Sequence, residues 1–124
     1  SLANDYYFTT ARTVAHAISL DIDLGKRSNK TKANGYTFEH PIPSKVILSA
    51  LLDVQSKEER HEILSFSDRV VILSSDEDSL LNNAQLRDKM PDGWKFYDDV
   101  FSRYEKVGIQ ILPEKIKMKG AIRR

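Results

Sequence analysis

The chain has 124 residues, of which 40% are hydrophobic and 30% are charged, so we expect one domain over residues 1–124 with a buried core. It contains no cysteine, which excludes disulfides, thiol nucleophiles and cysteine-bound zinc. No apolar run approaches the roughly 20 residues of a membrane span, so we expect no membrane partner. Because the chain begins at Ser1 and not at Met, we expect a trimmed chain or a domain excised from a longer polypeptide.

The first half of the chain predicts a helix, a polar loop, a short strand and a second helix. Apolar residues recur at helical spacing over about residues 5–21. Residues 25–35 are expected to form a loop, because a polar run without apolar periodicity lies there between two glycines. Residues 36–39 are typical of a strand that two prolines end. An apolar stripe then predicts a helix over about residues 43–54.

The second half predicts further helices and two strands. Ser56 and Ser74 each lie three residues before a glutamate, and this capping-box pattern predicts the start of a helix. Residues 69–73 are the best strand candidate, and we expect a central strand, because residues 70–73 are apolar and three of them are β-branched. A last helix over about residues 95–107 and a final strand over residues 109–112 complete the prediction. The elements together predict an α+β fold, with four or five helices packed with a small sheet of about three short strands.

Charge is distributed unevenly along the chain, although the formal net charge is only +1. Residues 24–52 hold five basic residues and one acid, and the tail from residue 113 is also basic. Residues 53–78 hold eight acids and three basic residues. If the two basic segments meet in space, they form a phosphate-binding face; otherwise both are solvated loops.

The pair Glu39-His40, placed between a short strand and a proline turn, is the best candidate site. An imidazole with a pKa near ~6.5 can act as a base or a metal ligand at neutral pH. A neighbouring carboxylate can hold a hard divalent cation. The structural alternative is that His40 is a surface residue at a turn and Glu39 an unrelated surface acid.

The spacing of Glu39, His40 and Pro43 resembles the opening of HNH-type nucleases, in which an acid–histidine pair ends the first strand of a ββα-metal hairpin. The resemblance covers about residues 36–90. It implies that residues 69–73 form the second strand, and that the next helix carries the remaining ligands. The connection between the two strands holds about two extra helices.

This resemblance implies a role for each residue. Glu39 would ligate a divalent metal ion, Mg or Zn, and His40 would activate the attacking water. Asn83, or Asn82, would orient the base or complete the metal site. The function implied is that of a small metal-dependent endonuclease domain that hydrolyses phosphodiester bonds in DNA or RNA, of the bacterial toxin or phage effector type.

Basic residues near these segments are the candidates for binding nucleic acid. The candidates are Arg12, Lys26, Arg27, Lys30, Lys32, Lys45, Arg87 and Lys89.

Two alternatives stay open at this point. One is a non-enzymatic module of the immunity or inhibitor type, which would bind a protein partner through the acidic segment 53–78. The other is a metal-free RNase toxin that uses His16 and His40 as acid and base. For a nuclease toxin we also expect a cognate inhibitor or immunity protein. The expected location is the cytoplasm, either of the producing cell or of a target cell into which the domain is delivered.

Overall fold

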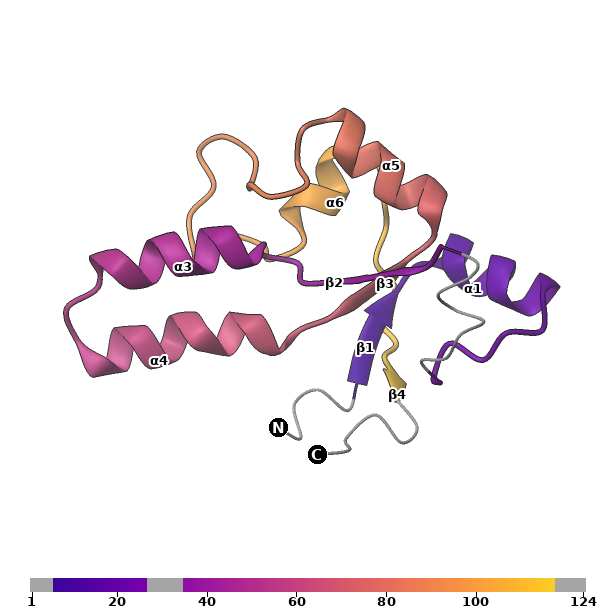
Figure 1. Ribbon diagram of the computed structural model, residues 1–124, viewed down its shortest axis with the longest axis horizontal. Helices are drawn as coiled ribbons and strands as arrows, with labels where there is room; N and C mark the ends of the chain where they lie inside the picture. The colour runs from indigo at the N-terminus through magenta and orange to yellow at the C-terminus, as the bar shows by residue number, and fades with distance from the viewer. Residues whose placement is uncertain (1–5, 27–34, 118–124) are drawn as a thin grey trace.

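The computed structural model describes residues 6–26 and 35–117, and a small mixed sheet lies at its centre (Figure 1). The strands are β1 (Tyr6–Thr9), β2 (Thr37–Glu39), β3 (Val71–Leu73) and β4 (Ile116–Lys117). Their order in the sheet is β2-β3-β1-β4. β1 and β3 pair in parallel, whereas β2 and β4 run antiparallel to their neighbours. The apolar strand expected to be central is therefore an inner strand of the sheet.

Helices cover both faces of this sheet in the described part of the chain. They are α1 (Ala11–Ser19), α3 (Ser44–Asp53), α4 (Lys57–Ser65), α5 (Ser75–Asn83) and α6 (Ser102–Lys106), with a short 3-10 turn η2 (Phe66–Asp68) after α4. Successive residues of a strand point to opposite faces. Ile72 accordingly packs in one core with Ala17 of α1. Leu73 packs in a second core with Leu81 of α5 and Tyr104 of α6. The expected α+β fold is confirmed at this level.

Helices α3 and α4 form a hairpin that extends away from the sheet (Figure 1). The hairpin has a core of its own, in which Ile47 of α3 and Ile63 of α4 pack with Met90. On the outer side of α3, Leu48 is 63% exposed and Leu52 is 86% exposed. The hairpin therefore buries one apolar side and leaves leucines on the other.

The start of α5 confirms the capping box expected at Ser74. The Ser74 hydroxyl accepts a hydrogen bond from the Glu77 amide, and the Ser74 amide donates to Glu77 Oε1 at 3.2 Å. Thr10 and Thr13 donate from their hydroxyls to the same oxygen, at 2.9 and 2.7 Å. The cap thereby joins the start of α1 to the start of α5 in the interior.

The helix expected over residues 5–21 is wrong in its first turn, because residues 6–9 form β1 and α1 begins only at Ala11. Aromatic and β-branched residues at these positions suit a strand. Phe8 pairs with Val71 of β3 in the parallel register. The Thr10 hydroxyl then accepts a hydrogen bond from the Thr13 amide and starts the helix.

The helix expected over residues 95–107 is also wrong in its first half, since α6 begins at Ser102. The Asp98 carboxylate accepts a hydrogen bond from the Lys95 amide at 2.8 Å. The Asp99 carboxylate accepts one from the Phe101 amide at 2.9 Å. Such side-chain bonds to the backbone compete with a helix.

The final strand expected over residues 109–112 is reduced to a single bridge between Ile111 and Thr10. Pro113 has no amide hydrogen and cannot continue a ladder. The chain pairs with β1 again at β4, so the described sheet has four strands where about three were expected.

Candidate functional site

A cleft of about 480 Å³ opens at the end of β2, where the sequence places Glu39 and His40. One wall comes from β2 and the start of α3, and the other comes from α5 and the segment that follows it. The cleft is lined by Thr37, Phe38, Glu39, His40, Pro43, Ser44, Lys45, Asp78, Arg87, Asp88 and Arg103. Four of the residues singled out from the sequence therefore meet here: Glu39, His40, Lys45 and Arg87.

The imidazole of His40 is held in one orientation. Nδ1 lies 2.9 Å from the carbonyl oxygen of Arg69, the residue two before β3. A carbonyl oxygen can only accept, so Nδ1 is the protonated nitrogen in this bond. In a neutral ring Nε2 then carries a lone pair, and no described residue forms a hydrogen bond with it. This tautomer leaves Nε2 able to accept a proton as a general base.

Glu39 has one carboxylate oxygen bound inside the protein. Oε1 accepts hydrogen bonds from Arg103 Nη2 at 2.9 Å and from the Tyr104 hydroxyl at 2.6 Å. No described residue bonds to Oε2. Burial, and then the negative charge of Glu39, raise the pKa of Tyr104 well above its usual value, so the phenol stays a donor.

Two exposed cations, Lys45 and Arg87, line the same cleft from opposite walls. Lys45 Nζ lies 3.7 Å from Asp88 Oδ2, and both side chains are mostly exposed, so this ion pair is weak. The exposed Arg87 makes no ion pair with any described residue. The guanidinium of Arg87 and the ammonium of Lys45 are thus available to an anion that enters the cleft.

The expected metal ligands on α5 do not line this cleft. Asn82 Nδ2 instead donates to Asp78 Oδ2 at 3.4 Å, and Asn83 is exposed near the end of the helix. In residues 6–26 and 35–117, no group of three or more His, Cys, Asp or Glu side chains could hold a metal ion. Glu39 is therefore the one expected ligand that lines the cleft.

Other predicted residues lie elsewhere. His16 Nδ1 is 2.7 Å from the Tyr36 hydroxyl on the α1 face of the sheet, and His16 does not line the cleft. Arg12 is paired with Asp76 at 2.8 Å on the surface. Lys26 and Lys89 are exposed and do not line the cleft. Arg27, Lys30 and Lys32 lie outside the described residues.

The acidic segment 53–78 is not one continuous surface. It contains β3, whose three residues are fully buried, and Glu77, which caps α5 in the interior. Its exposed acids lie mainly on α4.

Arg103 is the residue that sequence reasoning missed. Its side chain is 1% exposed, and it contacts several groups of the cleft walls. A signal was present, since Arg103 lies three residues after Val100 and four before Val107, on the apolar stripe of the expected helix. A charged residue on an apolar stripe indicates a buried charge that needs partners.

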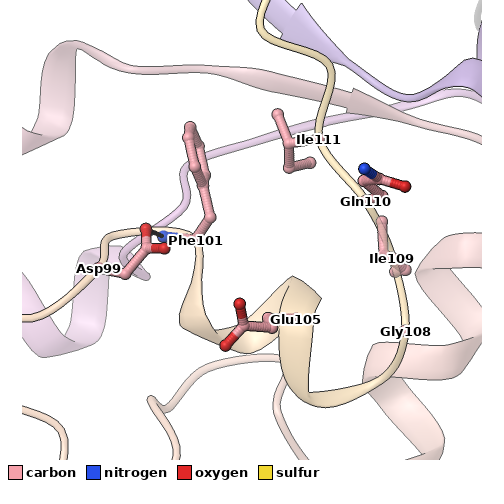
Figure 2. Close-up of a pocket in the computed structure, with 7 residues that line it drawn as sticks. All are labelled: Asp99, Phe101, Glu105, Gly108, Ile109, Gln110 and Ile111. Atoms are coloured by element: carbon pink, nitrogen blue, oxygen red, sulfur yellow. Dashed lines mark hydrogen bonds between the residues drawn. The ribbon is translucent and has the colours of Figure 1, made fainter.

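A second pocket, of about 420 Å³, lies between α6 and the segment that follows it (Figure 2). Phe101, Ile109 and Ile111 give it apolar walls, and Asp99 and Glu105 bring two carboxylates. It contains none of the candidate site residues expected from the sequence.

Comparisons with known proteins found no match: no family model, curated protein or solved structure matches this chain. In the part of the chain that the structure describes, no helix has the length and apolar character needed to cross a membrane.

Proposed function

We propose that the protein cleaves phosphodiester bonds of nucleic acid in the cleft at the end of β2. One observation carries this proposal: His40 is oriented by the Arg69 carbonyl with Nε2 unbonded, in a cleft that Lys45 and Arg87 also line. A base beside two cations suits a reaction in which a proton leaves the nucleophile while negative charge grows on phosphate.

The order of the elements supports the resemblance to HNH-type nucleases. β2 carries the acid–histidine pair at its end, β2 pairs antiparallel with β3, and α5 follows β3 directly. Helices α3 and α4 occupy the connection between the two strands and extend away from the sheet (Figure 1). The insertion therefore leaves a strand–strand–helix unit intact.

Each part of the chemical step that needs the protein can be assigned to a side chain of the cleft. His40 Nε2 accepts a proton from water while the water oxygen attacks phosphorus. The bond between phosphorus and the leaving ester oxygen breaks, and that oxygen takes a proton from solvent. Lys45 and Arg87 offset the charge on the non-bridging oxygens.

Of the expected metal ligands, Glu39 alone is placed to bind a divalent ion in the cleft. Asn82 and Asn83 do not fit as further ligands, because neither lines the cleft and Asn82 donates to Asp78. A hard cation such as Mg²⁺ would bind Oε2 of Glu39, to which no described residue bonds, and would polarise a phosphate oxygen. The proton transfer to His40 and the attack of water on phosphorus do not require this ion.

The test compares His40→Ala with the matched variant His61→Ala, since His61 is exposed on α4 and does not line the cleft. The substrates are a supercoiled plasmid and a single-stranded RNA, each with Mg²⁺, with Zn²⁺ and with EDTA. We expect cleavage by His40→Ala to be about 10²–10⁴-fold slower, as for loss of a general base. His61→Ala should match the wild type, and circular dichroism should show both variants folded. Equal cleavage by His40→Ala and wild type would falsify the proposal.

A second candidate function, a protein-binding module of the immunity or inhibitor type, is favoured by the exposed leucines of the α3–α4 hairpin. Leu48 and Leu52 of α3 and Leu64 of α4 are 63%, 86% and 48% exposed. Absence of cleavage under every metal condition, together with weaker binding of a candidate partner protein by Leu52→Ser, would favour this function over the first.

A further inference from the structure

We propose that Arg103 is a positioning residue of the cleft, because its buried guanidinium sets the distance between the His40 base and the Arg87 cation. This inference rests on the proposed function, but its geometric part can be tested without activity. Arg103 comes from α6, which supplies no other residue to the cleft.

The guanidinium binds the wall of the cleft that carries the base. Nη2 donates to the carbonyl oxygen of His40 at 2.8 Å and to Glu39 Oε1 at 2.9 Å. Nε donates to the carbonyl oxygen of Pro41 at 3.0 Å. Three consecutive residues at the end of β2 are thus held by one side chain.

The same guanidinium also binds the wall that carries Arg87. Nη1 donates to the carbonyl oxygen of Leu86 at 2.7 Å and, more weakly, to that of Arg87 at 3.4 Å. These residues follow α5 and have no strand or helix of their own to hold them. The two walls are 47 positions apart in the chain (87 − 40), and Arg103 is bonded to both.

Only arginine can supply this set of bonds. Its five N–H groups lie in one plane and in fixed directions, and here they meet acceptors on both walls. A lysine at this position would keep the charge opposite Glu39 but would donate from a single atom. Arg103→Lys therefore keeps the buried ion pair and loses the bridge between the walls.

Because Arg103 is buried, we expect it to affect the geometry of the cleft and not to contact the substrate. Its side chain is 1% exposed and its donors are used by the protein itself. It acts through His40 and Arg87, whose placement governs proton transfer and phosphate binding. A misplacement of about 1 Å in such groups can slow a reaction about 10²-fold.

The experiment uses Arg103→Lys, with Lys106→Met on the exposed side of α6 as the matched control. The first readout is NMR of the His40 ring and the Arg87 guanidinium, with the His61 ring as an internal reference. We expect the signals of His40 and Arg87 to move in Arg103→Lys, and the signal of His61 to stay. Lys106→Met should leave all three signals unchanged.

The second readout is cleavage in a double-mutant cycle with Arg87→Ala. We expect Arg103→Lys to lower kcat about 10–100-fold, and Arg87→Ala to have a smaller effect in that background than in the wild type. Unmoved signals together with a wild-type kcat, or additive effects in the cycle, would overturn the inference. If the wild type cleaves nothing but the signals move as expected, the proposed function fails while the placement of both walls by Arg103 stands.

Discussion

Replacing Tyr104 by phenylalanine removes a single oxygen atom from the interior and tests the polar network beside the cleft. Tyr104 is 0% exposed, and its hydroxyl donates to Glu39 Oε1 at 2.6 Å. A hydrogen bond to a charged group contributes about 1.5–3 kcal/mol. Phenylalanine keeps the packing with Val71 and Leu81, so the lost bond dominates. We expect the free energy of unfolding at pH 7 to fall by about 1.5–3 kcal/mol.

The pH dependence of this difference follows from the raised pKa of Tyr104. Burial and the neighbouring Glu39 raise this pKa in the folded state, whereas in the unfolded chain the phenol titrates near its usual ~10. The folded state keeps its proton where the unfolded chain loses it. The stabilisation is therefore complete below about pH 10 and is lost as the pH rises toward the folded pKa. The difference between wild type and Tyr104→Phe should shrink above about pH 10.

Urea unfolding at pH 7, 9 and 10.5, followed by circular dichroism, measures both effects. The matched control is Tyr97→Phe, because Tyr97 is 88% exposed and a change there should alter the free energy by less than about 0.5 kcal/mol. A Tyr104→Phe variant as stable as the wild type at pH 7, or a difference that grows above pH 10, would refute this account of the network.

Two further changes test the core and the cap of α5. Leu81→Ala should lower the free energy of unfolding by about 2–5 kcal/mol, because Leu81 is 1% exposed between β3 and α6. Leu52→Ala on the exposed side of α3 should cost less than about 0.5 kcal/mol in the same urea titration, and equal losses would contradict the assigned core. Ser74→Ala should cost about 0.5–2 kcal/mol through loss of the cap, which thermal unfolding would detect. An unchanged melting temperature would show that Glu77 and Thr13 hold the start of α5 without the Ser74 hydroxyl.

The elements predicted correctly are those whose signals lie within a few neighbouring residues. The capping box at Ser74 and the apolar stripe of α3 act through contacts three or four positions apart. The strand–turn pattern likewise predicted that Glu39 and His40 lie where a short strand ends, and β2 ends at Glu39.

What the sequence by itself determined is therefore local: the caps, the periodic helices, the buried strand β3 and the position of the acid–histidine pair. The tertiary structure decided what depends on distant partners. Residues 6–9 became a strand because β3, more than 60 positions away, pairs with them. Arg103 became a buried bridge because acceptors from two separate segments converge on it. Strand pairing and the burial of a charge are stable only when such partners are present, and sequence spacing does not show where those partners lie.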